Sequence, residues 1–259
     1  MSGLSEEGVL YALFAFIRVG AILFSVPIFG DHPTPVRVRI LLGVAVTIVI
    51  FPMIPQVWFR PVSNDLLLMV TIILREILVG LAIGYLSKLA FDALLMAASI
   101  VGYQMGFGTA NIVLADQVQQ INGFEALHKM LIMLIFLSLD LHIFFLNGIN
   151  DSFAYIPLGI ADMGPGFIEF TIGLSGQIFM IALKLGAPVL VALMFTMAAL
   201  GLVARSVPQI NIFTMSFPTS FFIGLIVYIV SIPLFPEWFS IHFTRIFTDI
   251  FTSLGGMAN

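Results

Sequence analysis

The sequence predicts an all-α integral membrane protein whose spans are short and interrupted. Of its 259 residues, 60% are hydrophobic and only 9% are charged, whereas charged residues make up about a quarter of a soluble domain. The mean hydropathy of +1.13 points the same way. Apolar runs then predict helical segments at residues 9–28, 40–55, 66–87, 89–106, 127–147, 172–203 and 217–235.

Ionisable residues lie inside several of these segments, where an ordinary span would have none. The positions are Arg18, Arg75, Glu76, Asp140 and Lys184. Because a central charge facing lipid costs a few kcal/mol, we expect these helices to be shielded largely by other protein. The alternative is that long side chains extend to the membrane surface, which could serve Lys184 but poorly explains Arg18.

Proline-rich connections and a glycine pair frame the first three segments. DHPTPVRVR (31–39) and FPMIPQVWFRP (51–61) cannot be regular helix, because each proline removes a donor and restricts the residue before it. In the third segment, the Gly80–Gly84 spacing predicts close approach of another helix. Adjacent Arg75 and Glu76 point about 100° apart on that helix, so we expect them to have separate partners.

The fifth and sixth segments carry their own irregularities. Asp140 and His142 are two residues apart and therefore lie on different faces of a helix. They could belong to a proton path, but an interior polar pair with its hydrogen bonds satisfied is the preferred interpretation. Lys184 and Pro188 interrupt the sixth segment, and IPLGIADMGPG (156–166) breaks the chain before it.

The stretch at 202–218 predicts a structural helix break. Pro208 ends one helix, and the next begins near Phe217 and Pro218. The carbonyl groups left free by such a break need hydrogen-bond donors. The side chains placed to supply them are Arg205, Gln209 and Asn211.

No catalytic pattern occurs in the chain. GxSxG, HExxH and Walker motifs are absent, the four histidines show no ligand spacing, and there is no cysteine. The sequence therefore predicts no enzyme, no catalytic residue, no cofactor and no metal site. A net charge of −4 without a Lys/Arg run also argues against a nucleic-acid partner.

Five stretches, taken together, resemble one family of membrane proteins. They are PIFGDHPTPVRVRILLG (27–43), REILVGLAIGY (75–85), GYQMGFG (102–108), DLHIFFLNGINDSFAYIPLG (140–159) and LVARSVPQINIFTMSFP (202–218). In these the chain is similar to the FliR family of flagellar biosynthesis proteins, whose counterpart in virulence secretion systems is SctT. The resemblance covers roughly 9–250, so one FliR-like domain over 1–259 is expected. One departure is Asp116-Gln117, where the family often carries Asp-Pro.

The resemblance implies a core structural subunit of the type III secretion export gate, in the bacterial inner membrane at the flagellar basal body. In that family, FliP-like and FliQ-like subunits join it in a hetero-oligomeric helical assembly of tilted, broken hairpins, and an FlhB-like switch protein is a further expected partner. The assembly surrounds a pore through which unfolded flagellar proteins are exported.

The polar stretch GYQMGFGTANIVLADQVQQING (102–123) has too few charges for a loop in water and too many amides for a span in lipid. In the family, the part matching 106–122 extends into the pore and helps to close it. Glycines permit a turn out of the helix, and apolar side chains block a lumen. The residues expected to form this plug are Gly106, Phe107, Gly108, Ile112, Val113, Leu114 and Asp116. An ordinary re-entrant or interfacial loop is the alternative.

A small secondary transporter or ion channel is the rival function, because internal charges can mark a substrate path. Transporters commonly contain internal repeats with paired broken helices. The sequence shows no convincing repeat, and 259 residues is small for two such halves. A membrane enzyme lacks any candidate active site.

Overall fold

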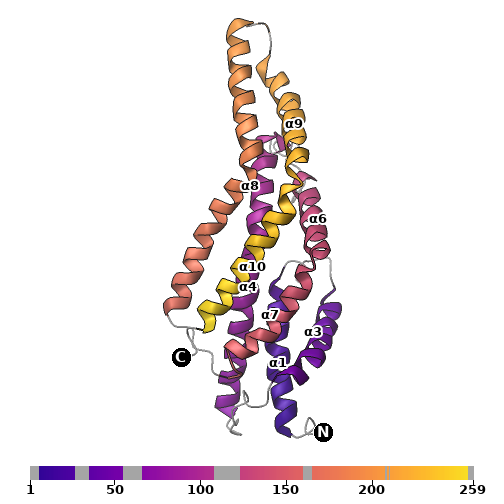
Figure 1. The fold of residues 1–259 in the computed structure, drawn as a ribbon, viewed down its shortest axis with the longest axis vertical. Helices are drawn as coiled ribbons and strands as arrows, with labels where there is room; N and C mark the ends of the chain where they lie inside the picture. The colour runs from indigo at the N-terminus through magenta and orange to yellow at the C-terminus, as the bar shows by residue number, and fades with distance from the viewer. Residues whose placement is uncertain are drawn as a thin grey trace. The chain divides into compact units, whose positions relative to one another are not determined.

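The computed structural model describes residues 6–26, 35–54, 66–107, 123–159, 165–207, 209 and 211–255 (Figure 1). Their regular structure is helical, which confirms the all-α class. The elements are α1 (Glu6–Ser25), α3 (Val36–Ile50), the 3-10 turn η1 (Phe51–Met53), α4 (Leu66–Gln104), α6 (Gly123–Ser138), α7 (Leu141–Tyr155), α8 (Pro165–Ser206), α9 (Ile212–Ser231) and α10 (Leu234–Gly255).

Membrane-spanning character follows from helix length and apolar composition. Within the described residues, five helical segments are long and apolar enough to cross a bilayer, and the bent pair α6 and α7 would make a sixth. The five segments are Gly8–Ser25, Val36–Met53, Leu66–Gln104, Thr171–Ser206 and Thr214–Ser231.

The chain divides into two compact units. Unit 1 contains Met1–Ala90, Asp140–Ser175 and His242–Asn259, and unit 2 contains Phe91–Leu139 and Gly176–Ile241. That both form one export-gate domain stays a prediction.

In unit 1, α1 packs against α3 and against the first half of α4. A Cβ atom at Gly80 would lie 2.6 Å from both the Cβ of Ala21 and the carbonyl oxygen of Arg18. One at Gly84 would lie 2.5 Å from the Cβ of Ser25. Only glycine leaves room for this approach, as the spacing of the pair predicts.

In unit 2, the second half of α4 packs with α6, α8 and α9 around one apolar core. It includes Val101 of α4, Met105 directly after α4, Phe124 of α6, Leu193 of α8 and Tyr228 of α9, all less than 6% exposed. After α8, the chain reverses and α9 runs back beside it (Figure 1).

Two of the predicted segment boundaries are wrong around charged residues. The segments predicted at 66–87 and 89–106 are one helix, α4. Lys88, which separated them, is a good helix former and does not interrupt the backbone. Conversely, the segment predicted at 127–147 is two helices, because Asp140 takes a φ of 55° in the left-handed region between α6 and α7.

Pro188 and Pro218 do not end or begin a helix. α8 continues through Pro188, and α9 starts at Ile212 and continues through Pro218. Apolar helices tolerate an internal proline where neighbouring groups satisfy the freed backbone. α10 lies outside the predicted segments. On its buried face, phenylalanines recur every four residues at Phe235, Phe239, Phe243 and Phe247.

Candidate functional site

Arg18, in the middle of α1, is fully buried inside unit 1. Its Nε donates to Oε2 of Glu76 on α4 at 2.6 Å. Its Nη1 donates to the carbonyl oxygens of Ser152 at 3.2 Å and Ile156 at 2.7 Å. The guanidinium carbon also lies 4.6 Å from the ring centroid of Phe153. These contacts tie α1 and α4 to the end of α7.

The same site holds the turn that follows α7. Oε1 of Glu76 accepts a hydrogen bond from the backbone N–H of Gly159 at 2.8 Å, and Nη1 of Arg75 donates to the Gly159 carbonyl at 3.2 Å. Gly159 has a φ of 83°, which glycine adopts without strain. Arg75 and Glu76, adjacent on α4, therefore bind the carbonyl and the N–H of the same glycine. Of these two residues, Glu76 also forms the ion pair with Arg18.

The electrostatics of this centre are internally balanced. Glu76, like Arg18, has no exposed surface, and the two charges neutralise each other. The carbonyl groups that face Arg18 belong to Ser152 in the last turn of α7 and to Ile156, its C-cap, at the negative end of the helix dipole. The shielding expected for Arg18 is thus supplied by its own chain.

Gly106 and Phe107, just after α4, are the two predicted plug residues within the described part of the chain. The helix ends at Gln104, and Gly106 takes a φ of 95°, so the chain leaves the helix there. A Cβ atom at Gly106 would lie 2.6 Å from the ring of Phe217 on α9. Met105 packs against Gly224, also on α9. Contacts inside unit 2 therefore fix the point where the polar stretch begins.

Phe107 lies among aromatic rings of unit 2. Its ring centroid is 5.8 Å from that of Phe124 on α6, in a stacked arrangement, and 5.6 Å from that of Phe221 on α9, edge to face. Such pairs stabilise packing beyond simple burial. In this structure Phe107 anchors the start of the polar stretch against two helices.

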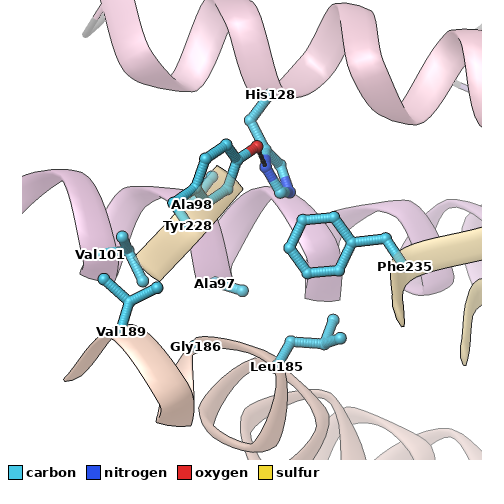
Figure 2. Close-up of a pocket in the computed structure, with 9 residues that line it drawn as sticks. All are labelled: Ala97, Ala98, Val101, His128, Leu185, Gly186, Val189, Tyr228 and Phe235. Carbon is cyan, nitrogen blue, oxygen red and sulfur yellow. Dashed lines mark hydrogen bonds between the residues drawn. The ribbon is translucent and has the colours of Figure 1, made fainter. Parts of the chain in front are cut away.

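His128 and Tyr228 form a buried polar pair that sequence analysis missed (Figure 2). Nδ1 of His128 on α6 lies 2.6 Å from the hydroxyl oxygen of Tyr228 on α9. The His128 ring is also edge to face with Phe235 at the start of α10. All three side chains line a small cavity together with apolar residues of α4 and α8. Neither residue falls in a motif or a charge pattern that would have marked it.

Other predicted site residues lie apart from these centres. Asp140 is exposed, so it does not form an interior pair with half-buried His142 within this chain. Lys184 is exposed on α8, and Arg205 is exposed in the last turn of that helix. Gln209 and Asn211 are exposed between α8 and α9. The assembly roles predicted for these residues stay predictions.

Several predicted residues lie outside the described residues. They are Gly108, Ile112, Val113, Leu114 and Asp116 of the plug, and Pro208 after α8. Within the described part of the chain, no group of three or more His, Asp or Glu residues could hold a metal ion.

Comparison with known proteins gives one consistent result. The family model described as bacterial export proteins, family 1, matches residues 9–246. A flagellar biosynthetic protein FliR from Aquifex aeolicus is 28% identical over 94% of this chain and 93% of its own. The FliR of Bacillus subtilis is 30% identical over 84% of each chain. That of Escherichia coli is 28% identical over 92% of this chain and 91% of its own.

Proposed function

This chain belongs to the bacterial export proteins, family 1, and on that premise we propose that it is a membrane-embedded subunit of the flagellar export apparatus. The family match over residues 9–246 carries the proposal, together with relatives named as flagellar biosynthetic proteins over most of their length. Its contribution is structural and not catalytic.

The finer proposal places the chain in the bacterial inner membrane at the flagellar basal body. There, as one domain, it assembles with FliP-like and FliQ-like subunits and an FlhB-like switch protein around a protein-conducting pore. Unfolded flagellar proteins pass through that pore.

The apolar surface of α8 supports an assembly with partners. Exposed large apolar side chains run along this helix from Ile172 to Val203, about 46 Å at 1.5 Å per residue. That length along the helix exceeds a hydrocarbon core of about 30 Å. Cover by partner protein would account for the excess.

The Arg18–Glu76 pair weighs against the transporter alternative. Arg18 and Glu76 are the only charged side chains that are buried among the described residues. They bind each other and the backbone at the end of α7. A substrate or ion path needs polar groups that are free to exchange partners, and this pair is committed to holding the fold.

We further propose that residues 106–122 close the pore at rest. The φ of 95° at Gly106 and the ring contacts of Phe107 support this proposal, because they fix the position where the segment begins. Apolar side chains such as Leu114 would exclude water and hydrated ions from a narrow lumen. An ordinary connecting loop is the alternative.

The export role is tested by removing the chain. Deleting its gene should abolish secretion of flagellar hook and filament proteins into the culture medium and stop motility. Full-length chain supplied from a plasmid should restore both. Normal secretion in the deletion strain would contradict the proposal.

The plug is tested by deleting residues 110–117 only. The assembly should still form, because this deletion leaves the contacts of Gly106 and Phe107 intact. The membrane should become leaky to ions, as measured by conductance or by growth at high salt. An assembled complex as tight as the wild type would mean that another subunit makes the seal.

A further inference from the structure

One face of α8 in unit 2 is exposed and combines large apolar side chains with the polar side chains of Gln177 and Lys184. Residues spaced by about 3.6 positions share one helix face. Those that form this face, called the α8 stripe below, are Gln177, Met180, Lys184, Pro188, Val191 and Phe195, all exposed. The opposite face is buried, with Gly186 against Val101 of α4. The stripe is therefore the side of α8 that its own unit leaves uncovered.

Lys184 lies at the centre of the α8 stripe and forms no ion pair or hydrogen bond within the described residues. The helix contains an internal proline four residues later, Pro188. Because proline has no N–H, the carbonyl of Lys184 also loses its helical hydrogen bond. An ammonium group and a backbone acceptor are thus available at the same turn.

Lipid alone does not suit this face at any depth. Lys184 lies about 20 Å along the helix from Thr171 and about 33 Å from Ser206, the ends of the apolar segment. If Lys184 is within the hydrocarbon layer of about 30 Å, its charge lacks a counter-ion. If it is at the membrane surface, the apolar residues on one side of it extend into water. Either placement requires protein against the stripe.

We propose that the α8 stripe docks a membrane helix of a different subunit and that this helix carries one Asp or Glu opposite Lys184. The inference rests on the proposed function, because that subunit is one of the export apparatus. Apolar residues before and after Lys184 supply the packing surface, and the charge fixes the register of the two helices. Interfacial charges act in this way, favouring one partner and one alignment over others.

Two α8 stripes packed on each other do not provide a counter-ion for Lys184. No Asp or Glu occurs from Thr171 to Ser206, so two stripes packed on each other would place lysine against lysine. Like charges brought together at an interface are repulsive. This repulsion argues against stripe-on-stripe packing of two copies, and the inference therefore assigns the carboxylate to a different subunit.

The first test locates the neighbour in the native assembly. A photo-crosslinking residue is placed at Met180 or Val191 of the full chain, and the adduct is identified by mass spectrometry. The expected result is an adduct with one helix of another membrane subunit, at positions next to an Asp or Glu. Adducts only with lipid or only with a second copy of the chain would overturn the inference, as would a cross-linked helix without an acidic residue.

The second test reverses the charge. Lys184→Glu should lower the recovery of the cross-linked partner with the chain by roughly tenfold, since it places two carboxylates together. Replacing the partner's acidic residue by Lys in the same cells should restore recovery. Lys184→Arg, which keeps the charge, is the matched control and should assemble normally. Unchanged recovery with Lys184→Glu, or no restoration by the compensating change, would overturn the inference.

Two further measurements keep the outcome decisive. If Lys184→Glu lowers the amount of chain in the membrane, the uncharged Lys184→Met variant is measured instead, and its full recovery of partner would overturn the inference. Secretion of hook protein is followed in parallel. If the wild-type chain supports secretion but the stripe variants assemble normally, the docking surface is rejected. The proposed function is unaffected by that result.

Discussion

Arg18 in α1 and Lys184 in α8 are both cations in the middle of apolar helices, yet their surroundings are opposite. Arg18 has no exposed surface and binds Glu76 and two backbone carbonyls. Lys184 is exposed and has no ion-pair partner within the described residues. Arg18 is thus a closed cation, meaning that it is buried and paired inside its own unit, whereas Lys184 is an open cation, exposed on the surface of its unit.

The difference shows that charges in apolar helices can serve two purposes. Glycines on α4 let it approach α1 closely, which brings Glu76 within reach of Arg18. On α8 the segment from Thr171 to Ser206 has no carboxylate, and the side chains on the face that carries Lys184 are exposed within the described part of its unit. We therefore expect Arg18 to stabilise the subunit and Lys184 to serve contacts beyond it.

The largest loss of stability should come from breaking the buried Arg18–Glu76 pair, called the closed centre below. Arg18→Leu or Glu76→Leu leaves one buried charge without its partner, which costs about 3–5 kcal/mol of folding free energy. The chain should lose most of its abundance in the membrane, and its thermal midpoint in detergent-solubilised membranes should fall sharply. The double variant Arg18→Met with Glu76→Leu should recover part of this loss, because no unpaired charge remains.

An exposed ion pair on α10 is the matched control. Arg245 and Asp249 lie 3.9 Å apart with 78% and 51% of their side chains exposed. Replacing either by Ala should change stability by less than about 1 kcal/mol. Lys184→Leu should likewise leave the thermal midpoint of the chain unchanged. A loss after Lys184→Leu as large as that after Arg18→Leu would end the distinction between closed and open cations.

The second effect tests how the closed centre is brought together. Gly80→Ala places a methyl group 2.6 Å from the backbone of Arg18, so α1 and α4 must move apart. Overpacking of this kind costs about 1–3 kcal/mol. Gly20→Ala in α1 is the matched control, since its methyl group would meet nothing within 4 Å. It should raise stability by about 0.5–1 kcal/mol, because alanine is the better helix former. Equal thermal midpoints for the two variants would contradict the close approach.

A smaller effect separates charged from neutral buried pairs. Tyr228→Phe removes the hydroxyl that contacts His128 and should cost about 1 kcal/mol. Adding His128→Leu should return stability to near the wild-type value, because no buried polar group is then left unpaired. Thermal midpoints of the single and double variants give the coupling between the two residues. Additive losses would mean that the pair is not coupled.

What the sequence could predict follows from the same contrast. Charges stand out in an apolar sequence, so the sequence predicts that Arg18 and Glu76 need protein around them. Which chain supplies that cover depends on contacts between residues 58 positions apart, and no local pattern reports them. His128 and Tyr228 carry no such signal, because a neutral pair in an aromatic core is compatible with ordinary packing. Composition alone was enough to predict the helical class. The break at Asp140 depends on a left-handed backbone angle, which the sequence does not specify.

The smallest predicted effect concerns Asp140, which the sequence grouped with the interior charges. It is exposed and takes a φ of 55° before α7, without a side-chain capping hydrogen bond. Its contribution is therefore to the backbone and not to a charge network. Left-handed conformations are strained for side chains with a Cβ atom, and aspartate tolerates them better than most. Asp140→Gly should thus be neutral or stabilise the chain by less than about 1 kcal/mol.

Asp151→Gly is the matched control for this variant. Asp151 is also exposed but lies inside α7, where glycine costs helix stability. Its thermal midpoint should fall, whereas that of Asp140→Gly should hold or rise. If both variants lose stability to the same extent, the carboxylate of Asp140 has a partner that its exposure in this chain does not reveal. Asp140 would then join Lys184 among the open charges.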